Sequence, residues 1–183
     1  PFLDLSSEYF YESSVSASTY GTFTNAVAGP ASLDRDSLSC IYVNKYRADQ
    51  LELGDLYSEV KNGTWTWERF FEIMARFDDY NAARAEKGYV TISTYSAYPF
   101  AESIADLVFH SSNETYLSKD GERLAVSESL RQGSSLLEVA KNLLSVGYRY
   151  DGEDFIDRFN GGTLAFVFGT LDMTKELSDS PYD

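Results

Sequence analysis

The sequence has very little of the chemistry on which disulfides, metal centres and nucleophilic enzymes are built. It contains one cysteine, Cys40, and one histidine, His110, among 183 residues. These two side chains cannot supply a disulfide framework or a zinc site. Cys40 lies in the apolar run "SCIYVN", where an unpaired thiol usually packs as a small hydrophobic side chain. We therefore expect neither a metal nor a cofactor.

Basic residues are also scarce. There are 15 Lys and Arg residues against 29 Asp and Glu residues, which gives a formal net charge of −14. A surface of this sign repels a nucleic-acid backbone and an anionic membrane. We expect no nucleic-acid partner, and a ligand that is neutral or cationic.

Long hydrophobic runs are missing. No apolar run approaches the roughly 20 residues of a membrane-spanning helix. The segment "PFLDLSSEYF" lacks the charged and apolar regions of a signal peptide, which neither indicates nor excludes export. With 43% hydrophobic and 24% charged residues, the chain is typical of a soluble globular protein. Residues 1–183 are expected to form one domain.

The usual catalytic signatures are absent too. No G-x-S-x-G surrounds a serine, and no G-x-G-x-x-G or Walker-type loop occurs. Carboxylates are plentiful, for example Asp151, Glu153, Asp154 and Asp157. A glycosidase needs two carboxylates that face each other across a site, but solvated helix faces carry the same residues. We expect a protein without catalytic activity and keep a glycoside-acting enzyme as an alternative.

Aromatic residues are what the sequence has in abundance, with 14 Tyr, 12 Phe and two Trp. Both tryptophans stand in "NGTWTWERFF", where Thr66 is a candidate helix N-cap and Glu68 complements the helix dipole. An apolar stripe at helical spacing follows from Trp67 to Phe77, which predicts a helix packed on a core. Trp65 lies outside the cap, where it can pack against the helix end or contact a ligand.

The remaining patterns alternate between strands and helices. Strands are expected at 40–44, 89–93 and 163–169, and a hairpin turn at Asp120-Gly121. Helices are expected at 45–51, at 55–63, from Pro99 to about His110, from Ser127 to about Val146, and at 152–162. The predicted buried stripe of the helix that ends near Val146 contains Leu130, Leu137, Ala140 and Leu144. This order predicts an α/β fold with a mainly parallel sheet flanked by helices.

Candidate ligand-binding residues follow two of the predicted strands. Tyr95 and Tyr98 come after the strand at 89–93, and Gly169 and Thr170 end the strand at 163–169. Open α/β sheets bind ligands at the carboxyl ends of their strands. Tyrosine rings suit the faces and hydroxyl edges of a sugar, and bare glycine backbone with free amides can approach a ligand closely.

Three segments together resemble a known family. "IYVNK" at 41–45, "GDLYSEVKNGTWTWERFFEI" at 54–73 and "FNGGTLAFVFG" at 159–169 resemble, in that order, motifs of the extracellular solute-binding proteins that deliver sugars to ABC importers. The second segment is the most specific, and the resemblance spans about residues 1–169.

The resemblance implies a periplasmic-binding-protein fold, in which two α/β lobes close on a ligand. By this resemblance the chain is mostly the second lobe, without the first lobe and the return segments. It implies non-catalytic binding of a carbohydrate and delivery to the membrane subunits of an ABC transporter. It also implies an extracellular or periplasmic location, with a lipid anchor on the full-length protein, and a mainly structural role for the two tryptophans.

The resemblance also bears on individual residues. Loops that match "STYSAYPF" often carry the family's ligand aromatics, which favours Tyr95 and Tyr98. Tyr20 and Asp36 precede the strand at 40–44, in a region that commonly faces the cleft. At 170–173 the sequence reads "TLDM", where sugar binders commonly have an aromatic platform. A surface interaction module with an exposed aromatic patch is a further alternative.

Overall fold

The computed structural model has a four-stranded mixed sheet at its centre, with strand order β3-β8-β4-β7. The edge strand β3 (Ser39–Val43) is antiparallel to β8 (Leu164–Thr170). The other two neighbouring pairs, β8 with β4 (Ser93–Ser96) and β4 with β7 (Arg149–Tyr150), are parallel. The structure describes residues 3–30, 38–96, 108–109, 111–112, 116–120, 123–128, 134–146 and 149–177.

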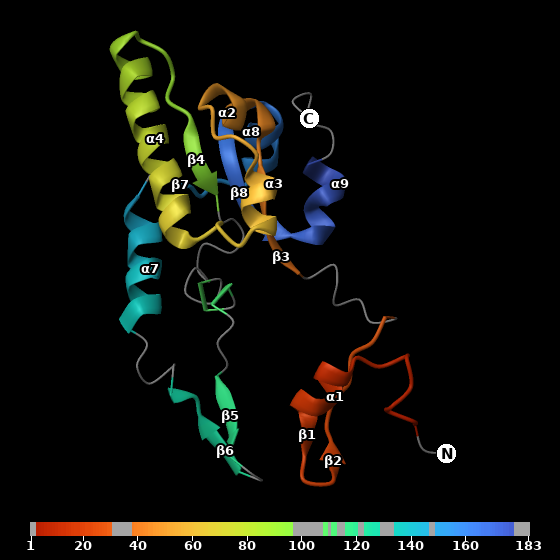
Figure 1. Ribbon diagram of the computed structural model, residues 1–183. Coiled ribbons are helices and arrows are strands. Elements are labelled where there is room, and N and C mark those ends of the chain that lie inside the picture. Colours follow the sequence, from red (N-terminus) through yellow and green to blue (C-terminus); the bar gives the residue numbers. More distant parts are fainter. Residues whose placement is uncertain are drawn as a thin grey trace.

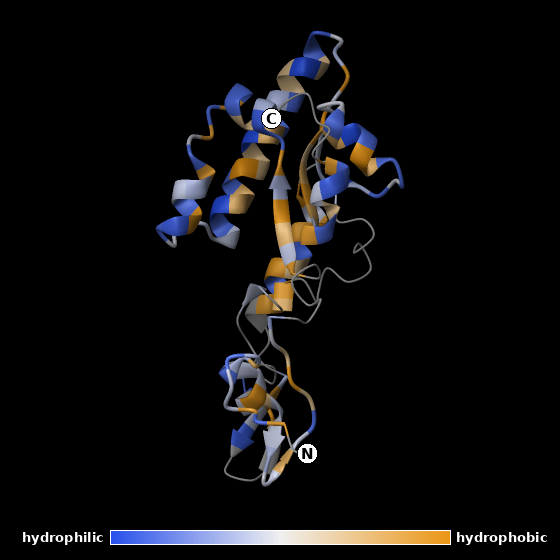
Figure 2. Ribbon diagram, turned by 90° about the vertical axis from the view of Figure 1, so that its right-hand side faces the viewer, coloured by the Kyte–Doolittle hydropathy of each residue, from blue (hydrophilic) through white to orange (hydrophobic). Residues whose placement is uncertain are grey.

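Helices cover both faces of this sheet (Figure 1). Along β8, Phe166 and Phe168 point into the larger core with α4 and α7, whereas Val167 joins a smaller core with α8 and α9. Figure 2 shows hydrophobic strands in the sheet, whereas the helices carry both hydrophilic and hydrophobic residues. The helices are α2 (Lys45–Gln50), α3 (Leu56–Lys61), α4 (Trp67–Glu86), α7 (Ser134–Ser145), α8 (Phe155–Asn160), the 3₁₀ turn η3 (Leu171–Met173) and α9 (Thr174–Leu177).

Two small hairpins lie apart from the sheet, in the lower half of Figure 1. One pairs β1 (Thr19–Tyr20) with β2 (Phe23–Thr24), after α1 (Glu12–Ser18). The other pairs β5 (Leu117–Asp120) with β6 (Arg123–Val126), which confirms the hairpin expected around Asp120. The ammonium of Lys119 joins the two units, because it donates to the carbonyl of Thr19 at 2.6 Å and to that of Ser16.

The helix expected after Thr66 is confirmed. Thr66 has extended backbone, and its hydroxyl accepts a hydrogen bond from the amide of Arg69 at 3.2 Å. Four core residues then follow on one face of α4, at positions i, i+3, i+4 and i+7: Phe70, Ile73, Met74 and Phe77. The stripe of apolar residues read from the sequence is therefore the face that packs on the sheet.

Removal of this cap gives a first prediction. The variant Thr66→Ala should lose about 1 kcal/mol of unfolding free energy, because the amides of the first turn of α4 lose their side-chain acceptor. Thr66→Ser keeps a hydroxyl at this position and should stay within about 0.5 kcal/mol of the parent. Urea unfolding of the three proteins measures the difference. Equal stability of the Ala and Ser variants would contradict the capping role.

The strand expected at 89–93 is displaced towards the C-terminus. β4 begins at Ser93, whereas Tyr89 and Val90 are 60% and 80% exposed. The cause lies in α4: the buried side chain of Asn81 accepts from the amide of Ile92 at 2.8 Å and donates to its carbonyl at 2.9 Å. The backbone of Ile92 therefore pairs with a side chain before the strand begins.

The stripe predicted for the helix that ends near Val146 is wrong in part. Ala140 is buried, but Leu137 and Leu144 are each 55% exposed, and Leu143 is the fully buried leucine of α7. The sequence pattern therefore placed the buried stripe on a neighbouring face of the helix. Leu130 lies outside the described residues. Of the helix expected from Pro99 to His110, the structure describes residues 108–109 alone.

The sheet also differs from the mainly parallel one expected, because β3 runs antiparallel to β8. β3 is a partly exposed edge strand, whereas β8 is buried between two neighbouring strands along almost its whole length. No helix in the described part of the chain has the length and apolar character needed to cross a membrane.

Candidate functional site

The candidate site lies at the edge of the sheet where β8 and β4 end. These strands are parallel, so their carboxyl ends meet at the same edge. β3 is antiparallel to β8, which brings its first residue, Ser39, beside Thr170. We call residues 169–173, which comprise the last two residues of β8 and the 3₁₀ turn η3 that leads to α9, the β8 turn. Two of the residues predicted to bind a ligand, Gly169 and Thr170, are therefore adjacent at this edge.

Gly169 does not offer the open backbone that was expected. It is buried in the strand and pairs with Cys40. A Cβ atom at Gly169 would lie 2.5 Å from the sulfur of Met173 and 3.5 Å from the ring of Tyr42, so side chains already occupy that space. The amide of Leu171 is not free either, because it donates to the carbonyl of Leu38 at 3.1 Å. Packing within the β8 turn has replaced the expected contact of bare backbone with a ligand.

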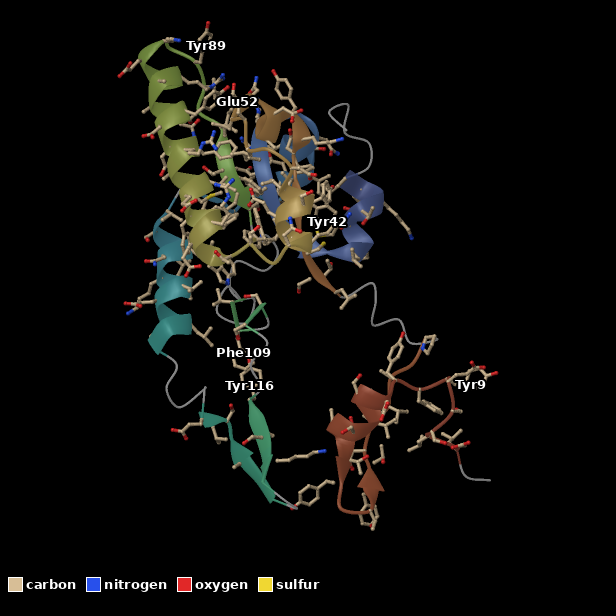
Figure 3. The ribbon with its side chains drawn as sticks, viewed as in Figure 1. Tyr9, Tyr42, Glu52, Tyr89, Phe109 and Tyr116 are labelled. Atoms are coloured by element: carbon tan, nitrogen blue, oxygen red, sulfur yellow. The ribbon has the colours of Figure 1, made fainter. Side chains whose placement is uncertain are left out.

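Thr170 is partly exposed and belongs to a group of hydroxyls. The hydroxyl of Tyr42 donates to the carbonyl of Thr170 at 2.8 Å and lies 3.0 Å from the hydroxyl of Thr174. The hydroxyl of Thr170 donates to a carboxylate oxygen of Asp172. Tyr42 lies on β3 beside α9 (Figure 3). The β8 turn, with Tyr42 of β3 and Thr174 of α9 beside it, thus presents hydroxyls and one carboxylate. These are groups that exchange hydrogen bonds with a neutral polar ligand.

Burial sets the protonation of the two titratable groups of β3 at this edge. It is the main cause that raises the pKa of the Tyr42 hydroxyl and the pKa of the Cys40 thiol, and the Asp172 carboxylate raises both further. Tyr42 therefore stays a neutral hydrogen-bond donor at neutral pH. Cys40 stays a thiol, which suits the packing role expected from the sequence.

Tyr95 does not lie in a loop after a strand. It stands inside β4, with no exposed surface, and its hydroxyl donates to the carbonyl of Leu143 in α7. Its ring packs edge-on against Phe70 and Phe168, with centroid distances of 6.3 and 5.8 Å. The predicted position in an open loop is wrong because β4 begins later than expected. In this structure the side chain joins the sheet to α7.

The burial of Tyr95 predicts a pH effect on stability. Burial raises its pKa from 10.0 to about 12. Between these two pH values the tyrosine is ionised in the unfolded chain but neutral in the folded protein. The free energy of unfolding therefore keeps its full value below pH 10 and falls as the pH rises towards 12. Tyr95→Phe should flatten this decline in urea titrations from neutral to alkaline pH. An identical slope in both proteins would contradict the assignment.

Of the other three predicted ligand residues, the structure describes Tyr20 alone, and Tyr20 does not lie at this edge. Tyr20 lies in β1, 43% exposed, and Figure 1 shows its hairpin at the opposite end of the molecule from the sheet. Tyr98 and Asp36 lie outside the described residues. Tyr98 comes two residues after Ser96, the last residue of β4.

Sequence reasoning missed Tyr42, Asp172 and Thr174 as members of this edge. The apolar run "CIYVN" gave no reason to select Tyr42. Side chains alternate between the two faces of a strand, so Tyr42 lies on the opposite face from Ile41, and this alternation was the available signal. Asp172 and Thr174 lie two and four positions after Thr170, and polar residues at alternate positions after a buried strand were the available signal.

The carboxylate cluster around Asp154 has local partners. Asp151 accepts from Arg149 at 2.6 Å, and Asp154 accepts from Arg158 at 3.1 Å and from the hydroxyl of Tyr150. No group of three or more His, Cys, Asp or Glu side chains that could hold a metal ion occurs within the described ranges. In this cluster the sequence pattern corresponds to ion pairs on the protein surface.

Comparisons with known proteins give no information about the function. No model of a known protein family, no curated protein and no solved structure matches the chain.

Proposed function

We propose that residues 1–183 form one α/β lobe of a non-catalytic solute-binding protein that presents a carbohydrate to an ABC importer. The ligand is held between this lobe and a second one, in an extracellular or periplasmic location. The full-length protein is held at the membrane by a lipid anchor. Its partners are the sugar and the membrane subunits of the transporter.

One observation supports this proposal above all others: the three segments that carry the family resemblance pack against one another. The strand of "IYVNK" pairs with that of "TLAFVFG" along five residue pairs. The side-chain amide of Asn44 donates to the carbonyl of Phe159 at 2.9 Å, and the backbone amide of Asn44 donates to the carbonyl of Ala165. Motifs separated by more than a hundred residues therefore make one unit, as parts of one family signature should.

The tryptophan motif belongs to the same unit. The ring of Trp67 stacks on Phe168 of β8 at 6.2 Å, and its indole N–H donates to Ser111 at 3.1 Å. Trp65 packs edge-on against Phe70 at 6.3 Å. Both rings are engaged with the lobe, which favours the structural role that the resemblance implies over ligand stacking.

In this proposal the β8 turn lines the cleft. The neutral donor Tyr42 orients the carbonyl of Thr170, and Asp172 and Thr170 exchange hydrogen bonds with sugar hydroxyls. A net charge of −14 suits a neutral ligand better than an anionic one. A single lobe carries half of the contacts, so its own affinity should be low.

A thermal-shift screen of the full-length protein tests the proposal. A panel of neutral mono- and oligosaccharides should contain at least one sugar that raises the melting temperature in a concentration-dependent way. Sugar acids and short peptides provide comparison sets. Release of reducing ends from the stabilising sugar would favour the glycoside-acting enzyme instead, and stabilisation by peptides alone would contradict a carbohydrate ligand.

A further inference from the structure

The chain contains two Asn-Gly dipeptides, Asn62-Gly63 and Asn160-Gly161, and the structure treats them differently. Asparagine followed by glycine is the dipeptide most prone to deamidation, because glycine has no side chain to obstruct attack by its own nitrogen. We propose that Asn62 is a site of spontaneous chemical modification in the folded protein, and that Asn160 is protected by its packing.

The reaction needs only the chain and water. The backbone nitrogen of Gly63 loses its proton to hydroxide and attacks the side-chain carbonyl carbon of Asn62. The bond from that carbon to Nδ2 breaks and releases ammonia, which leaves a five-membered succinimide. Water then opens the ring at either carbonyl, so the net change consumes one water and yields aspartate or isoaspartate plus ammonia.

Asn62 is open to this reaction. It is the exposed C-cap of α3, and its side chain makes no hydrogen bond to any described residue. Gly63 has a φ of 68°, and a Cβ placed there would meet nothing within 4 Å. The amide of Gly63 makes one backbone bond, to Val60 at 3.1 Å. Ring closure therefore requires only the last turn of a short helix to fray, which costs little free energy.

Asn160 is held in place. Its side chain donates to the carbonyl of Glu176 in α9 at 3.1 Å, and its Oδ1 is buried. The amide of Gly161 donates to Asp157 at 2.8 Å, and a Cβ at Gly161 would lie 3.0 Å from the same carbonyl. The end of α8 leads directly into the buried strand β8. Attack at Asn160 therefore requires this packed connection to open, which is a larger unfolding event.

The product would change a structural junction. A carboxylate at residue 62 stands at the C-terminal end of α3, where the helix dipole disfavours negative charge. Isoaspartate also lengthens the backbone by one methylene, close to Trp65 and the cap residue Thr66. Modification should therefore loosen the connection between α3 and α4.

Peptide mapping after incubation at mildly alkaline pH tests the inference. Trypsin separates the two sites, because Asn62 falls in the peptide that ends at Arg69 and Asn160 in the one that ends at Lys175. An unincubated sample digested in parallel corrects for deamidation during digestion. In the native protein, Asn62 should gain the mass of an amide-to-acid change at least about tenfold faster than Asn160. In concentrated urea the two rates should become similar, since the sequence context is then all that remains.

The control variant Asn62→Gln should abolish the change in that peptide, because its ring closure would need a six-membered intermediate. Asn62→Asp should melt at a lower temperature than Asn62→Gln, as the helix dipole requires. Equal native rates at the two asparagines, or an Asn62 that stays intact in the folded protein while it reacts in urea, would overturn the proposal.

Discussion

Replacement of Phe70 with alanine is expected to remove about 3–5 kcal/mol of unfolding free energy, the typical cost of deleting a buried aromatic ring. Phe70 is 1% exposed. Its ring centroid lies 5.6 and 5.5 Å from the ring centroids of Phe166 and Phe168 of β8, and 6.0 Å from that of Trp67. Its loss leaves a cavity at the point where α4 contacts the sheet.

The matched control for this variant is Phe23→Ala, the same substitution at a ring that is 74% exposed. It should change stability by no more than about 0.5 kcal/mol. Urea unfolding at constant pH measures both variants. If the two substitutions cost the same, then α4 does not pack on the sheet through Phe70.

Asn81→Ala is expected to cost about 2–6 kcal/mol of unfolding free energy, because it leaves two buried backbone groups without a hydrogen-bond partner. The side chain of Asn81 has no exposed surface, and it satisfies both the amide and the carbonyl of Ile92. Each buried group left without a partner costs about 1–3 kcal/mol. The same substitution at Asn142, an exposed position of α7, should be close to neutral.

Hydrogen exchange locates the effect of Asn81→Ala. The amide of Ile92 should lose protection in this variant, and it should stay protected in Asn142→Ala. Unchanged exchange at Ile92 would mean that Asn81 does not set the start of β4.

The parts of the fold that the sequence predicts well are those with strong local signals. Thr66 and the apolar stripe after it predicted α4, and the uniformly apolar run before Gly169 predicted β8. Helix caps and long hydrophobic periodicities depend on neighbours in the chain, so they can be read without tertiary information.

The errors have a common physical origin in contacts between distant residues. β4 was placed too early because Asn81, eleven positions before Ile92, takes the backbone bonds there. Tyr95 was assigned to a loop for the same reason. The antiparallel pairing of β3 with β8 joins residues at opposite ends of the sequence, and no local pattern encodes its direction.

Of the predicted ligand residues that the structure describes, only two lie at the candidate site. Gly169 and Thr170 do stand at the expected edge, because a buried strand followed by polar residues points to the carboxyl end of a sheet strand. The occupation of the Gly169 backbone by Met173 and Tyr42 depends on how the turn folds back, which the sequence does not indicate.

The most direct test of sugar binding at the β8 turn is calorimetric titration of the full-length protein with the sugar that stabilises it most. Tyr42→Phe removes the hydroxyl that holds the carbonyl of Thr170, and it should weaken binding by about fivefold to tenfold, the value of one hydrogen bond. Tyr57→Phe, the same change at a ring that is 77% exposed on α3, should leave the dissociation constant unchanged. Equal affinity of the parent protein and both variants would contradict a ligand site at the β8 turn.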